Sequence, residues 1–369
     1  MPSQIHAADF TAPATRQRFV TLDGMRGIAA LAVVAHHFSE LFGAVPQGYL
    51  AVDFFFALSG FVVVKAYGRR LEQGLRPTQF LRLRFIRFYP LYLLAVLLKA
   101  ASVLLWVRVD PGRNFWTLRE LAGASAFNLL LLPDPFRWQA LPALVPAIAL
   151  FPLVGPAWSL FLELGVNYLY ALIRPSLTPR RLGWALAFCG ASLAVAVAHN
   201  GNADGGVCWA WDGQWLAGSR VTFSFGVGCG LAWLPPFRLP WVPAGLLLLV
   251  LGAALCGRPS PSGQAAYDLG FIFVLSPILV LLGAVNEPRQ AWAGRWMERL
   301  GLASYPIYLL HTTVGQSLEW VGKRALGGSQ AWFPALGGLT LVGLLFGMAL
   351  WLDAHYDRPA RRWLETRFG

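Results

Sequence analysis

The chain has 369 residues, of which 56% are hydrophobic and only 13% charged, and its formal net charge is +12. Soluble globular proteins carry about 25% charged residues, so the composition excludes an ordinary soluble enzyme, a disordered chain and a coiled coil. The basic residues gather in short links between apolar segments, a pattern typical of membrane topology rather than of nucleic-acid binding. We therefore expect a polytopic membrane protein that contacts lipid and binds no nucleic acid.

A membrane-spanning helix needs roughly 20 apolar residues to cross about 30 Å of hydrocarbon. The candidate segments are 24–43, 49–67, 88–108, 118–133, 157–173, 182–198, 217–234, 239–256, 267–285, 301–320 and 333–352, and the proline-broken stretch 140–155 is either another span or a re-entrant piece. Arginine is frequent in the links 69–87, 174–181 and 286–299 and in the tail 353–369, whereas the links 199–216 and 257–265 contain almost none. This asymmetry indicates that both termini are cytoplasmic. An even number of crossings is then required, so we predict an all-α transmembrane bundle of about 10 (10–12) spans.

The first apolar segment carries ionisable residues on one helical face. It reads LDGMRGIAALAVVAHHFSE from Leu22 to Glu40. At about 100° and 1.5 Å per residue, Arg26 and His37 share a face about 16 Å apart, with Arg26 near the cytoplasmic interface and His37 near mid-membrane. Glu40 lies one turn from His36 and His37 and could orient either ring. Because ionisable groups in lipid are costly, a functional site is favoured over a histidine that merely joins two helices.

The second segment carries a carboxylate, Asp53, beside three phenylalanines. An unpaired carboxylate would be costly there, so we expect it to pair with an arginine such as Arg26 or Arg84. Such a pair would be structural, or would hold that arginine in a binding site. The pair Ser59-Gly60 later in the segment predicts close helix packing rather than a nucleophilic serine.

Further along the chain, two arginines and two other ionisable residues are candidates for a site. Arg84 and Arg87 stand at i, i+3 and therefore on one helix face. They either anchor the segment at the cytoplasmic surface or bind phosphates, which guanidinium groups hold bidentately. Glu163 is either a protonated structural group or one that orients a histidine, binds a hydroxyl or transfers a proton. His311 is either structural or a substrate contact.

Motifs around these residues follow one another in chain order. They are LDGMRGIAALAVVAHHF with Arg26 and His37, GYLAVDFFFALSGFVV with Asp53, RLRFIRFYPLYLL with Arg84, Arg87 and Tyr89, AWSLFLELGVNYLY with Trp158 and Glu163, and SYPIYLLHTTV with His311. Together they resemble the motifs of the acyltransferase-3 family of integral membrane O-acyltransferases over nearly the whole chain. The chain departs from the family at its C-terminal glutamate-x-proline, which is here Asp357-Arg358-Pro359.

The resemblance implies an enzyme of the inner (cytoplasmic) membrane. It would move an acyl group, most commonly acetyl, from cytoplasmic acyl-CoA as co-substrate to a hydroxyl of a cell-envelope or exported glycan, with no bound cofactor. In this interpretation residues 1–20 are a cytoplasmic tail, 21–352 the membrane acyltransferase domain and 353–369 a basic cytoplasmic tail. The alternatives are a transporter or flippase of a sugar or lipid-linked glycan, and a non-catalytic membrane scaffold.

The resemblance also assigns roles to the candidate residues. His37 and Glu163 would be catalytic, His37 as general base or transient acyl carrier. Donor binding would fall to Arg26, Arg84 and Arg87. The supporting residues would be Asp53, Glu40, Tyr89, Trp158 and His311. We predict no metal site, because the sequence lacks a metal-binding motif and the adjacent His36 and His37 point about 100° apart on a helix.

Overall fold

The computed structural model describes residues 18–42, 45–109, 116–136, 149–204, 208, 210–235, 240–325 and 333–368. Within these ranges the regular structure is helical, apart from one isolated bridge between Ala149 and Ala210, so the predicted helical fold class is confirmed. The helices are α1 (Val20–His37), α2 (Ser39–Phe42), α3 (Ala51–Glu72), α4 (Pro77–Val109), α5 (Leu118–Leu129), α6 (Ala157–Ile173), α7 (Pro179–Asn200), α9 (Gln214–Trp233), α10 (Ala244–Leu255), α11 (Gln264–Gly270), α12 (Ser276–Val285), α13 (Ala291–Ala325), α14 (Phe333–Leu352) and α15 (Arg358–Phe368).

Several helical segments are long and apolar enough to cross a membrane. In the described part of the chain five satisfy both conditions, namely Gly48–Glu72, Pro77–Val109, Pro179–Asn200, Pro261–Val285 and Leu336–Phe368. These helices make the chain a multi-pass membrane protein.

Some helix boundaries agree with the predicted segments and others differ. α6 and α14 have the predicted limits, whereas α4 begins at Pro77 instead of residue 88. The span predicted at 118–133 is not confirmed, because α5 has 12 residues, extends about 18 Å and, unlike the equally short but wholly apolar α10, carries Arg119 and Glu120. A capping box at Thr117 starts it. Residues 1–17 of the predicted tail and most of the stretch 140–155 lie outside the described residues.

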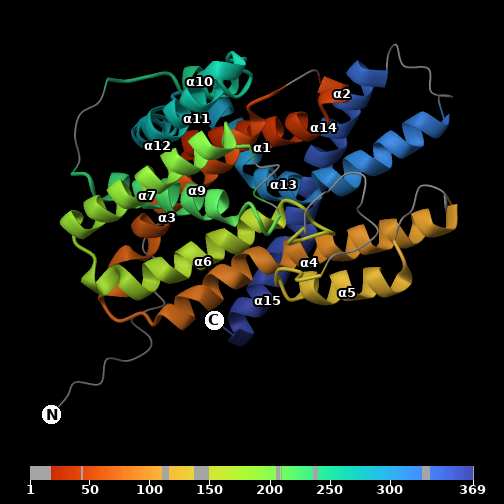
Figure 1. Cartoon of the computed structure of the whole chain (residues 1–369), viewed down its shortest axis with the longest axis horizontal. Coiled ribbons are helices and arrows are strands. Elements are labelled where there is room, and N and C mark those ends of the chain that lie inside the picture. The colour runs from red at the N-terminus through yellow and green to blue at the C-terminus, as the bar shows by residue number, and fades with distance from the viewer. Residues whose placement is uncertain are drawn as a thin grey trace.

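Close helix contacts hold the centre of the bundle together. Figure 1 shows α10, α11 and α12 along one edge, α4 with α5 along another, and α1 and α13 between them. A Cβ atom added to Gly60 of α3 would lie 2.1 Å from the Phe225 oxygen of α9, and one added to Gly228 of α9 would lie 1.9 Å from the Ala57 oxygen of α3. The two backbones therefore touch, as the Ser59-Gly60 pair predicted.

The helices α4 and α13 run parallel in a fixed register. The Tyr305 hydroxyl donates to the Phe88 carbonyl at 2.7 Å, and the Lys99 ammonium donates to the Gln316 side chain at 2.5 Å. Both contacts join residues 217 positions apart, so the two helices keep the same register from one contact to the other. This register places the motif ending in His311 beside the arginines of α4.

Candidate active site

A cavity of about 210 Å³ lies between α1, α3, α4, α6 and α13. Its charged lining is Arg26, Arg84, Arg87 and Glu163, so the fold gathers four of the predicted site residues from three helices. The three guanidinium groups outnumber the single carboxylate. Because this excess of positive charge lies among apolar walls, the cavity favours an anionic ligand.

Arg84 and Glu163 form the centre of this cavity. The Arg84 guanidinium donates to Glu163 Oε1 at 3.0 Å, and the Ser59 hydroxyl donates to the same oxygen at 2.6 Å. Arg84 also packs over the Phe88 ring at 4.7 Å. Its buried Nε has no hydrogen-bond partner among the described residues. Glu163 therefore holds the guanidinium in place at the wall of the cavity.

The other two arginines reach the cavity from separate anchors. Arg26 donates to the Gly301 carbonyl at 3.1 Å and to the Ser304 hydroxyl at 3.0 Å, both on α13. Arg87 lies 3.9 Å from the carboxylate of Asp357, which is the residue that replaces the family's C-terminal glutamate. This position therefore keeps a carboxylate beside a cavity arginine, despite the departure from the motif.

His37 lies at the end of α1 and is not part of the cavity lining. It is the last residue of the helix rather than a residue of its middle. Its Nδ1 contacts the Val33 carbonyl at 2.9 Å, and its ring lies 4.9 Å from that of the buried His311. Tyr308, which lines the cavity, is in turn 6.2 Å from His311, measured between ring centroids. His311 and Tyr308 thus connect His37 with the cavity.

The structure does not support the expected orienting role of Glu40. This residue is exposed on α2. The histidine rings contact backbone carbonyls instead, His37 that of Val33 and His36 that of Val45 at 3.2 Å. No hydrogen bond in the described part of the chain joins Glu40 to either ring, so its orienting role stays a prediction.

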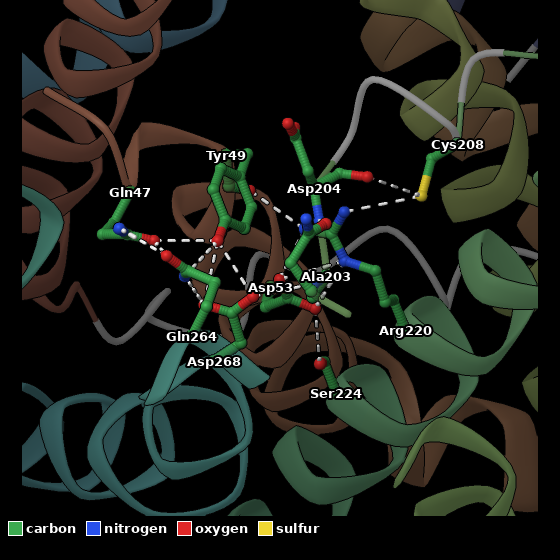
Figure 2. A network of polar contacts seen from close by, with 11 residues as sticks. Gln47, Tyr49, Asp53, Ala203, Asp204, Cys208, Arg220, Ser224, Gln264 and Asp268 are labelled. Carbon is green, nitrogen blue, oxygen red and sulfur yellow. Dashed lines mark hydrogen bonds and ion pairs between the residues drawn. The ribbon is translucent and has the colours of Figure 1, made fainter. Parts of the chain in front are cut away.

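Asp53 pairs with Arg220 of α9, and not with Arg26 or Arg84 as the sequence suggested. The Arg220 guanidinium donates to both carboxylate oxygens, at 2.6 Å in the shortest contact, and Ser224 adds a hydroxyl contact at 3.3 Å (Figure 2). Both charged side chains are fully buried. The sequence analysis missed Arg220. Because Arg220 is the single charged residue of α9, its position in an apolar helix could have indicated a buried ionic partner.

A second buried carboxylate, Asp268, lies beside this pair (Figure 2). It accepts hydrogen bonds from the Tyr49 hydroxyl at 2.9 Å, the Gln264 amide at 2.7 Å and the Ala203 backbone at 2.7 Å. The Tyr49 carbonyl accepts from Arg220 at 2.9 Å, which links the two carboxylates in one network. Because buried polar groups are costly when unpaired, the network ties together the start of α3, α9 and α11.

The two aromatic residues among the supporting candidates make structural contacts. The Tyr89 hydroxyl donates to the Leu129 carbonyl at 2.8 Å and so fastens α4 to α5. Trp158 packs edge-on against Phe56, and the Arg220 guanidinium lies 5.9 Å from its ring. Neither ring lines the cavity.

A metal site was not expected from the sequence. The described residues contain no group of three or more His, Cys, Asp or Glu side chains placed to hold an ion.

The chain is similar to known acyltransferases along most of its length. Residues 19–352 match the acyltransferase domain family Acyl_transf_3. The chain is 28% identical to "Acyltransferase MdmB" of Streptomyces mycarofaciens over 378 residues, which cover 89% of this chain and 87% of that protein. It is 45% identical over 198 residues to "Protein 2 in picA locus" of Rhizobium radiobacter, covering 50% of this chain and 96% of the relative.

A third relative is longer than this chain. The "Peptidoglycan O-acetyltransferase OatA" of Listeria monocytogenes is 25% identical over 327 residues, which cover 80% of this chain and 49% of that protein. No solved structure gives a significant match. The family match spans the bundle that carries the arginine cavity and the histidine pair, so the chain belongs to the acyltransferase-3 family and is a membrane-bound acyltransferase.

Proposed function

We propose that this enzyme moves an acyl group, in the first place acetyl, from cytoplasmic acyl-CoA to a hydroxyl of a cell-envelope or exported glycan. The observation that carries the proposal is the cavity in which Arg26, Arg84 and Arg87 converge beside a histidine pair. Guanidinium groups bind phosphates bidentately, and acyl-CoA carries several phosphates. The family match favours this transferase over the transporter and scaffold alternatives.

The separation of the arginines from His37 suits a long donor. Acyl-CoA holds its phosphates and its thioester at opposite ends of an extended arm. Arg26 and His37 are eleven residues apart on α1, which corresponds to about 16 Å. We place the phosphates at Arg26, Arg84 and Arg87 and the thioester carbonyl near His37, with Glu163 fixing Arg84.

His37 has the orientation that a general base needs. A carbonyl oxygen only accepts, so the contact with Val33 places the proton of the neutral ring on Nδ1 and leaves Nε2 unprotonated. Nε2 would remove the proton of the acceptor hydroxyl as its oxygen attacks the thioester carbonyl. The C–O bond forms, the C–S bond breaks and free CoA leaves. Nε2 could equally carry the acyl group in transit, with the same overall balance.

We further propose that ten passes cross the cytoplasmic membrane with both termini in the cytoplasm, and that residues 21–352 form the catalytic unit. The passes would be α1, α3, α4, α6, α7, α9, α10, α11 with α12, α13 and α14. An ion pair between Glu72 and Arg174 joins the basic ends of α3 and α6, which supports a common cytoplasmic side.

The topology is tested with activity tags. A tag placed after Gly369 should report the cytoplasm, and a tag inserted at Asp204 should report the opposite side of the membrane. Reversed signals at both positions would invert the topology.

The test of the activity is transfer by purified protein in lipid vesicles. Acetyl-CoA is supplied with an envelope glycan, and both thiol release and glycan ester are measured. His37→Ala should lose roughly 10²–10⁴-fold in rate, the usual contribution of a general base, whereas His36→Ala keeps a substantial part, since its ring is turned about 100° away. An inactive His36→Ala with an active His37→Ala would transfer the role to His36.

The acceptor class is tested in cells. Glycan fractions of the envelope and of the medium are analysed for ester groups with and without the gene. The peptidoglycan O-acetyltransferase among the relatives makes an envelope glycan the first acceptor to examine. Unchanged esterification in every fraction would refute a glycan acceptor, while thiol release by the purified protein would still report the transferase.

A further inference from the structure

The two histidines of the site hold their rings in the same way. His37 Nδ1 contacts the Val33 carbonyl of its own helix at 2.9 Å, and His311 Nδ1 contacts the Tyr308 carbonyl of its own helix at 2.8 Å. Because a carbonyl cannot donate, each neutral ring carries its proton on Nδ1 and keeps a basic lone pair on Nε2. The ring centroids are 4.9 Å apart, so two free bases belong to one site.

The surroundings of the two rings differ. His37 is exposed at the end of α1, whereas His311 is fully buried. The Nε2 of His311 is buried and has no hydrogen-bond partner among the described residues. His311 also adjoins Tyr308, at 6.2 Å between ring centroids, and Tyr308 lines the arginine cavity. His311 therefore neighbours both the exposed histidine and a residue of the cavity assigned to the donor.

Thioester transfer needs protons at two places. The acceptor hydroxyl must lose a proton when its oxygen bonds to the carbonyl carbon, and the sulfur that leaves must gain one because an alkyl thiol has a pKa near 8.5. These two atoms lie on different sides of the reacting carbon. One exposed base and one buried group next to a cavity residue can divide this task.

We propose that His311 is the second proton-transfer residue of the reaction and protonates the leaving thiolate. His37 Nε2 takes the hydroxyl proton, which passes to His311 Nε2 and then to the CoA sulfur as the C–S bond breaks. Both rings end neutral, and no other reactant is consumed. The inference rests on the proposed acyl-CoA transfer.

The test compares donors that differ in their need for this proton. An alkyl thioester, acetyl-CoA, expels a basic thiolate, whereas an aryl thioester, S-phenyl thioacetate, expels a less basic one that leaves without protonation. The variant His311→Asn keeps a donor for the Tyr308 carbonyl but does not titrate, and His311→Gln serves as a second variant of similar size. His355→Gln is the matched control, because that ring also contacts its own helix, at the Trp351 carbonyl.

We expect His311→Asn to lose about 10²-fold in kcat/KM with acetyl-CoA and less than about 10-fold with the aryl thioester. His37→Gln should lose activity with both donors, and His355→Gln with neither. Equal losses of the His311 variants with both donors, or no loss with either, would overturn the inference. If His311→Asn fails to insert, His311→Gln decides by the same comparison. Wild-type protein that transfers from neither donor would refute the proposed function itself.

Discussion

Replacement of Arg84 by lysine is the sharpest test of the donor cavity, because it keeps the charge and changes only its geometry. The guanidinium donates to Glu163 at 3.0 Å, packs over Phe88 at 4.7 Å and leaves Nε free of partners among the described residues. A lysine ammonium can still pair with Glu163, but it cannot present a second, planar donor to a phosphate. One charge-assisted hydrogen bond is worth about 1.5–3 kcal/mol. Arg84→Lys should therefore weaken acyl-CoA binding roughly 10- to 150-fold.

The assay is titration of acyl-CoA into purified protein in lipid nanodiscs, followed by the KM for thiol release. Arg82→Lys is the matched control, because Arg82 lies on the same helix, is exposed and does not line the cavity. It should bind the donor as the wild type does. Unchanged affinity in Arg84→Lys would refute phosphate binding by this residue. An equal loss in Arg82→Lys, outside the cavity, would show that the effect of Arg84→Lys does not come from the cavity and would refute the reasoning as well.

Two further predictions concern the packing around the site. Arg220→Ala should destabilise the protein by about 3–5 kcal/mol because it leaves Asp53 buried without its partner. In thermal unfolding of detergent-solubilised protein, the double variant with Asp53→Ala should lose less than the sum of the single losses, and simple additivity would contradict a coupled pair. Gly228→Ala should abolish stable insertion because its Cβ would lie 1.9 Å from a backbone oxygen of α3, whereas Gly218→Ala, with nothing within 4 Å, should be tolerated. Equal membrane yields of both glycine variants would argue against direct contact of α3 with α9.

Much of the site could be predicted from local sequence because its residues have a fixed spacing on single helices. Arg84 and Arg87 stand one turn apart on α4, and both line the cavity as their shared face indicated. Gly60 predicted a close helix contact, because glycine has no side chain and lets two helix backbones approach each other. The separation of Arg26 from His37 likewise follows from the helical rise alone.

The membrane class, most helices and most of the candidate site residues follow from the amino-acid sequence alone, because hydropathy and helical periodicity are properties of neighbouring residues. Which of these residues contact one another depends on the packing of the helices. Asp53 finds Arg220 across 167 positions of sequence, and Glu163 meets Arg84 across 79. The partner of a buried charge depends on which helices lie side by side and at what register, and no local pattern encodes that. The same packing brings the ring centroid of His311 to 4.9 Å from that of His37. The sequence motif that contains His311 does not indicate this contact.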